Sequence, residues 1–251
     1  MATIQFDKMH GLGNDFIVID RSVQPVALTT AQIVALCNRR TGIGCDQLIL
    51  LENSAIADLK MRIFNPDASE VEACGNATRC IVSREGRDIS IETAGGLLRA
   101  TMSDGSVAVN MGQPRFAWDA IPLAYAMDAQ NLPLAWDDLS GGCCVNVGNP
   151  HVVFFLQGDQ APDYAAIGPE IETDSVFPDR INVNFARVTD TGIDLVVWER
   201  GAGLTQACGT GACATAVAAI LQKRVSSPVA VHLPGGTLTI EWQAGGDITM
   251  H

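Results

Sequence analysis

Two cysteines, Cys74 and Cys208, stand in matching motifs and are the residues of this chain best suited to chemistry. Each follows Ala and precedes Gly and a small polar residue. At the same sequence offset Phe64 pairs with Trp198, and their neighbours match in type. The spacing between the two motifs is too long for a solenoid repeat, whose units span about 20–50 residues. We interpret it as a duplicated domain with one thiol in each half.

Two thiols on opposite sides of one carbon could exchange its proton. A thiolate would remove the proton from one face and a thiol would return one to the other, which is the chemistry of a racemase or an epimerase. The thiolate is the reactive form, and a free cysteine has a pKa of about 8.5. A helix N-terminus lowers that pKa and binds anions. We therefore expect a helix to begin at each thiol, with the carboxylate of an amino acid between the two helix starts.

The elements around the thiols are predicted from apolar patterning and breakers. One helix is expected at 75–83, directly after Cys74, and an Ala-rich one at 212–223. A further helix is expected after an N-cap at Thr29 or Thr30. Strands are expected in the first half at 4–8, 16–20, 47–52, 59–64, 89–93, 97–102 and 107–111, with hairpin turns at Gly95-Gly96 and Asp104-Gly105. In the second half they are expected at 152–156, 181–185, 194–198, 229–233, 238–242 and 247–251.

This arrangement predicts an α+β fold of two pseudo-symmetric domains, each a strand-rich, barrel-like sheet around a central helix. The first domain is expected to span residues 1–115 and to carry Cys74, and the second to span 116–251 and to carry Cys208. The boundary lies in a segment rich in Pro and Asp, residues 113–142. The second repeat stops at His251, and we expect its last strand to be truncated.

Composition excludes several classes of protein. The chain has 251 residues, 47% of them hydrophobic and 18% charged, which suits folded cores rather than disorder. A net charge of −12 argues against nucleic-acid binding. Neither a signal peptide nor an apolar run of about 18 residues is present, which argues against secretion and membrane insertion. Eight cysteines without a signal peptide favour reduced thiols in the cytoplasm.

We expect no cofactor and no metal. Lysine occurs only three times and never in a context typical of a pyridoxal-phosphate imine. No dinucleotide-binding or phosphate-binding glycine motif occurs. Zinc is disfavoured, because Cys74/Cys80 and Cys208/Cys213 lack the usual knuckle spacing and have no histidine nearby. The cysteines outside the two motifs are expected to be buried.

Several segments, in order, resemble signatures of the diaminopimelate epimerase family: 10–16 (HGLGNDF), 42–47 (GIGCDQ), 62–67 (RIFNPD), 148–151 (GNPH) and 199–203 (ERGAG) with 207–213 (ACGTGAC). The resemblance covers nearly the whole chain. It implies a cofactor-independent isomerase that interconverts LL- and meso-2,6-diaminopimelate on the route to lysine and peptidoglycan. It also implies that Cys74 and Cys208 are the acid–base pair. The chain departs from the family at Ala77-Thr78, where Gly and then Ala are common, and at Leu204, where Glu is frequent.

The resemblance further implies roles for individual residues. Substrate binding falls to Asn14, Gln47, Asn65, Gly75, Asn76, Asn149, Asn182, Glu199, Arg200, Gly209 and Thr210. His151 and Glu199 take positions that modulate the pKa of the thiols. The residue types suit a zwitterion, because asparagine both donates and accepts, Glu199 accepts from an ammonium group and Arg200 offers a bidentate fork.

Other functions are open at this point. The chain could be a related two-cysteine racemase of proline or hydroxyproline. Because that substrate has no distal amino-acid group, such an enzyme would not need residues that bind one. A non-catalytic amino-acid-binding protein or a thiol redox protein would need no proton transfer. Which thiol is ionised at rest, how the domains close and whether a homodimer forms are not determined by the sequence.

Overall fold

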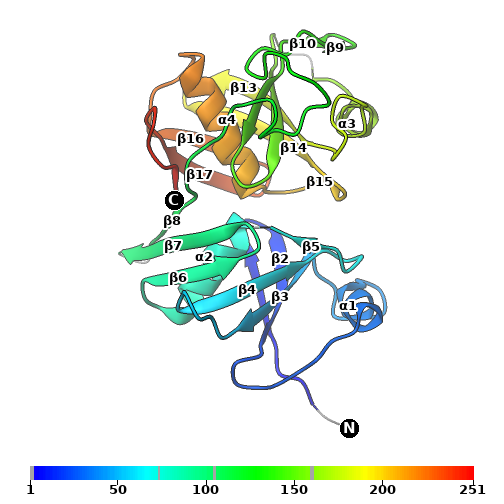
Figure 1. Ribbon diagram of the computed structural model, residues 1–251, viewed down its shortest axis with the longest axis vertical. Helices are drawn as coiled ribbons and strands as arrows, with labels where there is room; N and C mark the ends of the chain where they lie inside the picture. The colour runs from blue at the N-terminus through cyan, green and yellow to red at the C-terminus, as the bar shows by residue number, and fades with distance from the viewer. Residues whose placement is uncertain (1–2, 73, 104–105, 159–160) are drawn as a thin grey trace. The chain divides into compact units, whose positions relative to one another are not determined.

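The computed structural model describes residues 3–72, 74–103, 106–158 and 161–251, and it divides into two compact units, Met1–Asn110 and Met111–His251 (Figure 1). Ala73 and the turn expected at Asp104-Gly105 lie outside the described residues. The division follows strand β8 (Ser106–Asn110), whereas the sequence placed it after residue 115. The segment 113–142 therefore belongs to the second unit.

The first unit contains two helices and a sheet with both parallel and antiparallel strand pairs. The helices are α1 (Thr30–Cys37) and α2 (Gly75–Glu85), and the strands besides β8 are β1 (Asp7–Gly11), β2 (Asn14–Asp20), β3 (Gln47–Glu52), β4 (Leu59–Phe64), β5 (Glu70–Val71), β6 (Ile89–Thr93) and β7 (Gly96–Ser103). The strand order is β1-β2-β3-β4-β6-β7-β8, with β5 beside β4. The pairs β2–β3 and β4–β6 are parallel, and α1 and α2 form the crossovers that parallel neighbours require.

The second unit repeats this order. Its helices are α3 (Tyr164–Glu172) and α4 (Gly209–Leu221), and its strands are β9 (Ala135–Trp136), β10 (Leu139–Ser140), β11 (Cys143–Asn146), β12 (Pro150–Phe155), β13 (Asn182–Thr189), β14 (Gly192–Glu199), β15 (Gly203–Leu204), β16 (Val229–Leu233), β17 (Gly236–Glu241) and β18 (Thr249–Met250). The order β11-β12-β13-β14-β16-β17-β18 is that of the first unit, again with two parallel pairs bridged by helices. The α+β class with a helix inside a sheet in each half is confirmed.

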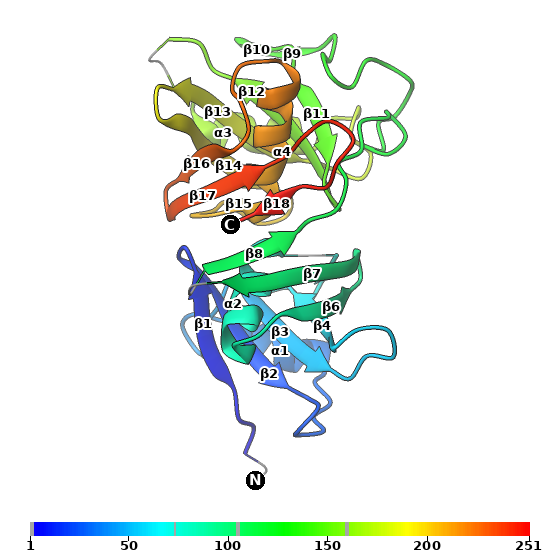
Figure 2. The same ribbon diagram turned by 90° about the vertical axis from the view of Figure 1, so that its left-hand side faces the viewer.

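Helix α4 lies inside the curved sheet of its unit, among β13, β14, β16 and β17 (Figures 1 and 2). Every residue from Gly209 to Ala219 is buried. Most of these side chains are Ala, Gly or Thr, so the strands can approach the helix closely. In the first unit, α2 contacts β1, β6, β7 and β8 in the same manner. No helix in the described part of the chain is long and apolar enough to cross a membrane.

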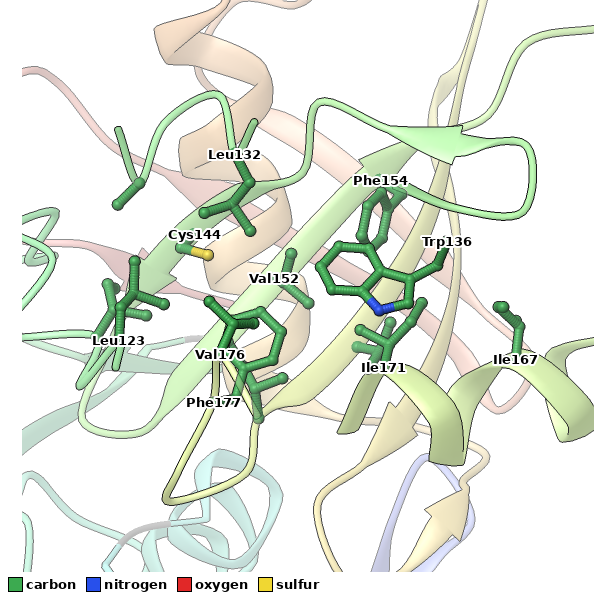
Figure 3. Packing of buried hydrophobic residues seen from close by; sticks show 14 of the residues in the cluster. Leu123, Leu132, Trp136, Cys144, Val152, Phe154, Ile167, Ile171, Val176 and Phe177 are labelled. Carbon is green, nitrogen blue, oxygen red and sulfur yellow. The ribbon is translucent and has the colours of Figure 1, made fainter. Parts of the chain in front are cut away.

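An aromatic cluster fills the side of the second unit that faces α3 (Figure 3). Trp136 stacks on Phe177 with ring centroids 6.1 Å apart and meets Phe154 edge-on at 5.8 Å. Ile167 and Ile171 of α3 complete the cluster. These contacts bury large apolar areas in favourable ring geometries, and they tie α3 to the sheet.

Most expected strands occur within a residue or two of their predicted ends, and the cap at Thr29 is present with its reciprocal Gln32 contact. The strand expected at 4–8 begins instead at Asp7, because it pairs with β2 through the tight turn Leu12-Gly13. Both turn residues have positive φ, as hairpins of this kind require. Helix α4 begins at Gly209 rather than at residue 212.

Helix α3 was not expected, because Gly168 and Pro169 interrupt its sequence pattern. The glycine is needed for packing. A Cβ at Gly168 would lie 2.5 Å from Cδ2 of Trp198. That indole is held in place by its hydrogen bond to Glu172 (2.7 Å), so it cannot move aside freely.

Gly168→Ala is therefore expected to destabilise the protein by about 1–3 kcal/mol, in the range of overpacked core substitutions. Urea unfolding measures the change. Glu170→Ala, at an exposed position of the same helix, is the matched control and should change stability by less than about 0.5 kcal/mol. Equal midpoints for the two variants would contradict the packing argument.

Candidate active site

The two thiols occupy equivalent places in their units. Cys74 is the N-cap residue of α2 and Cys208 is the N-cap residue of α4, both with extended backbone. Their carbonyl groups accept the first helical bonds, from Thr78 N (3.0 Å) and Ala212 N (2.9 Å). The expectation that a helix begins at each thiol is confirmed. Each Sγ therefore lies at the positive end of a helix dipole.

The immediate neighbours of Cys74 are two asparagines of the first unit. The thiol donates to Oδ1 of Asn14 at 3.7 Å, and Nδ2 of Asn76 donates to the same oxygen at 3.5 Å. Asn14 is oriented by Asp46, whose carboxylate accepts from its Nδ2 at 3.2 Å. Because the amide nitrogen of Asn14 is directed to Asp46, its carbonyl oxygen is the atom that faces Cys74. A carbonyl only accepts, so this contact favours the protonated thiol.

A group of charges keeps Asp46 in place. Arg39 bridges Asp15 and Asp46, with both N–O distances at 2.6 Å, and Lys8 pairs with Asp15 at 2.6 Å. Partial burial works to raise the pKa of Asp15, but the hydrogen bonds from Arg39 and Lys8 outweigh it and hold that pKa well below its usual range. The Asp15 carboxylate is thus charged at neutral pH, and Asp46, held by Arg39, keeps Asn14 in one orientation.

Cys208 has the opposite hydrogen-bonding polarity. Its sulfur accepts from the backbone N–H of Gly211 at 3.4 Å, and it lies 3.5 Å from the hydroxyl oxygen of Thr210. Only 5% of the residue is exposed. The Gly211 N–H that points at the sulfur stabilises its anionic form, so this contact favours a thiolate.

Gln47 begins β3, Asn65 directly follows the neighbouring strand β4, and their side chains meet. Nε2 of Gln47 donates to Oδ1 of Asn65 at 3.3 Å, and Asn65 donates to Ser69 at 3.1 Å. The carbonyl oxygen of Gln47 is buried and has no hydrogen-bond partner among the described residues. A buried acceptor without a donor is costly, so this atom is suited to a ligand's N–H group.

His151 lies on β12 and is completely buried. Its Nε2 is 2.9 Å from Oδ1 of Asn149, and its Nδ1 is 3.1 Å from Nδ2 of Asn184. Burial lowers the pKa of this imidazole to about 3. His151 is therefore neutral at physiological pH.

Asn182, Glu199 and Arg200 meet where β14 ends. Oδ1 of Asn182 accepts from the Arg200 backbone N–H at 2.9 Å. Nδ2 of Asn182 donates to the Pro150 carbonyl at 2.8 Å. The Glu199 carboxylate accepts from the Thr205 hydroxyl at 2.6 Å. Asn182 thus holds the backbone that carries Glu199 and Arg200.

The sequence analysis did not identify Glu172, a carboxylate only 5% exposed at the end of α3. It accepts from the Trp198 indole (2.7 Å) and from Gly201 N (2.9 Å), and it pairs with Arg180 at 3.5 Å. Glu172 therefore stabilises the turn 199–201 through its hydrogen bonds to Gly201 and to the neighbouring Trp198. No sequence signature contains it, and only the buried position of a charged residue indicates its role.

The site residues expected from the sequence thus form local sets within each unit. In the first unit these are Cys74 with Asn14 and Asn76, and Gln47 with Asn65. In the second unit they are Cys208 with Thr210, Asn149 with His151, and Asn182 with the backbone of Arg200. Gly75 and Gly209 begin the two helices. No cluster of three or more metal-binding side chains occurs within the described ranges.

Comparisons with known proteins agree with this arrangement. The protein-family model described as "Diaminopimelate epimerase" matches residues 6–117 and 143–251 of this chain. Curated relatives named diaminopimelate epimerase include one from Rhizorhabdus wittichii, 61% identical over 98% of this chain and 91% of that protein, and one from Zymomonas mobilis, 54% identical over 99% and 93%.

Solved structures share the fold at lower identity. A hydroxyproline epimerase from Agrobacterium vitis aligns with a TM-score of 0.71 at 16% identity, covering 98% of this chain and 87% of that one. A phenazine biosynthesis protein of the PhzF family from Bacillus anthracis aligns with a TM-score of 0.63 at 15% identity, covering 98% and 93%.

The buried neutral His151 makes stability depend on pH. Its pKa falls from about 6.5 in the unfolded chain to about 3 in the folded one, so between these values only the unfolded state binds the proton. Stability is therefore complete above pH 6.5 and is lost as the pH falls, by about 2 kcal/mol between pH 7 and pH 5. Urea unfolding at the two pH values should show a smaller difference for His151→Gln than for the wild type.

His232→Gln is the control for that measurement, because it removes a histidine from a partly exposed position of β16. If His151→Gln retained the full wild-type difference, another group would be responsible.

Proposed function

The chain belongs to the diaminopimelate epimerase family, which makes it an isomerase, and we propose that it interconverts LL- and meso-2,6-diaminopimelate with Cys74 and Cys208 and without a cofactor. The observation that carries the proposal is the equivalent placement of two thiols at two buried helix starts, with hydrogen-bond partners of opposite polarity. In this reading the enzyme serves lysine and peptidoglycan precursor synthesis.

We assign Cys208 as the thiolate and Cys74 as the thiol in the resting enzyme. The Cys208 thiolate removes the α-proton and becomes a thiol, and the electron pair left on carbon is delocalised into the α-carboxylate. Cys74 then gives its proton to the opposite face and becomes a thiolate. The reverse reaction exchanges the two roles. The mechanism requires both sulfurs to reach the same α-carbon.

The carbanion needs stabilisation by groups that are oriented toward it before the reaction begins. Backbone N–H groups at the starts of α2 and α4 are suited to bind the α-carboxylate and the charge that develops on it. Gly75 and Gly209, directly after the thiols, leave room for this approach. Fixed donors of this kind need no reorganisation during the reaction.

Substrate recognition is proposed to use the neutral amides and two charged side chains, those of Glu199 and Arg200. The unpartnered carbonyl of Gln47 and the adjacent Asn65 can receive N–H groups, and Glu199 and Arg200 can read an ammonium and a carboxylate group. We keep His151 and Glu199 as residues that tune the thiols. Because His151 is neutral, it acts through oriented hydrogen bonds rather than through charge.

The direct test is incubation of the reduced protein with LL-diaminopimelate in D₂O. We expect meso product with deuterium at one α-carbon. Cys74→Ala and Cys208→Ala should each lower turnover on the order of 10²–10⁴-fold, because one face of the carbon then lacks its acid or base. Cys80→Ala and Cys213→Ala remove buried thiols from the same helices and should retain turnover. Exchange into proline, and none into diaminopimelate, would refute the substrate assignment.

The assignment of the resting thiolate is tested separately. The far-ultraviolet absorbance of thiolates is titrated in Cys74→Ala and in Cys208→Ala, with the double variant subtracted as the background of the other cysteines. The thiolate that remains in Cys74→Ala should form at lower pH, because N–H donors stabilise the Cys208 anion. The reverse order would exchange the two assignments.

A further inference from the structure

Asn184 is a buried asparagine that no family signature contains. It lies on β13 two residues after Asn182, so both side chains point to the same face of the strand. The residue is 0% exposed. Buried amides of this kind are retained where their hydrogen bonds are specific, and here the partners determine one orientation.

Nδ2 of Asn184 lies 3.0 Å from the carbonyl oxygen of Val152 and 3.1 Å from Nδ1 of His151. A backbone carbonyl only accepts, so the amide group that faces it must be the NH₂. The same NH₂ faces Nδ1 at 3.1 Å and the Asn182 carbonyl at 3.5 Å, and because NH₂ only donates, Nδ1 must accept and therefore carries no proton. The neutral ring consequently carries its proton on Nε2.

That proton determines the orientation of Asn149. Nε2 lies 2.9 Å from Oδ1 of Asn149, and the N–H of the ring donates to this oxygen. The carbonyl of Asn149 is thus held by His151, and its NH₂ group points away from the ring. Asn149 is half-exposed on the turn between β11 and β12, so these two donors can reach a ligand.

Asn184 also contacts the helix that carries the thiol. Its Oδ1 is buried without a hydrogen-bond partner in the described chain. This oxygen lies 2.7 Å from where a Cβ of Gly211 would be, and Gly211 is the residue whose N–H donates to Cys208. Only glycine at 211 leaves room for the amide beside the first turn of α4.

We propose that Asn184 is a positioning residue that selects the Nε2–H form of His151 and thereby turns the NH₂ of Asn149 toward the substrate carboxylate. This inference rests on the proposed function. The proposal involves a chain of hydrogen bonds with a fixed direction. Asn184 donates to the Val152 carbonyl and to Nδ1 of His151, and Nε2–H of His151 donates to Asn149. No proton is transferred along it.

The test is ¹⁵N NMR of histidine-labelled protein together with steady-state kinetics. The His151 signals are identified by their loss in His151→Gln. The wild type should show a neutral ring protonated on Nε2. Asn184→Asp places an acceptor-only group at Nδ1, and we expect the neutral ring to shift to the Nδ1–H form, which removes the donor that holds Asn149. The value of kcat/KM should fall on the order of 10–100-fold, mainly through KM, because Asn149 loses its fixed orientation.

Thr93→Ala is the control. Thr93 is a buried polar residue of β6 in the first unit, and its hydroxyl donates to the Gly96 carbonyl at 2.9 Å. Its loss should lower stability without moving the His151 signals. The wild-type spectrum alone is decisive if Asn184→Asp does not fold, because a ring protonated on Nδ1 overturns the inference.

The two proposals fail in distinguishable ways. An Asn184→Asp protein that keeps the Nε2–H form overturns the role of Asn184, even if the wild type epimerises diaminopimelate. A wild type that shows the expected ring and its switch but no turnover refutes the proposed function, and it supports the hydrogen-bond chain.

Discussion

The unpaired N–H groups at the start of a buried helix are the constraint on which the rest of this structure depends. The first turns of α2 and α4 are enclosed by their sheets, so bulk water cannot satisfy those donors. Each helix therefore needs an acceptor at its start, and a thiolate and a bound carboxylate are both suitable. The parallel crossovers β4–α2–β6 and β14–α4–β16 place this helix start in the same position in each unit.

The site is held mainly by neutral groups whose orientation is determined by partners with a single hydrogen-bonding polarity. Asp46 can only accept, and it turns the carbonyl of Asn14 to Cys74. The Val152 carbonyl can only accept, and it determines the orientation of Asn184. Such amides position reacting groups without adding charge near a carbanion, and their buried bonds are strong because little water competes for them.

Much of the fold follows from local sequence. Strands such as β3, β4 and β16 coincide with their predicted ranges, because apolar runs bounded by breakers define them. Helix α3 was not predicted, since Gly168 and Pro169 weaken its local signal while packing on Trp198 and the aromatic cluster stabilises it. The same limit applies to the site. The signature residues were identifiable, whereas Glu172 and Asn184 lie outside the signatures and act only through their partners.

The sequence by itself determined the duplicated thiol motifs, the beginning of a helix at each and the membership of the family. Tertiary structure decided which groups each side chain meets. It decided the donor contact of Cys74 to Asn14, the acceptor contact of Cys208 with the Gly211 N–H and the neutrality of His151. The reason is physical: helix starts depend on neighbouring residues, whereas burial and hydrogen-bond partners join residues far apart in the chain, as His151 and Asn184 do.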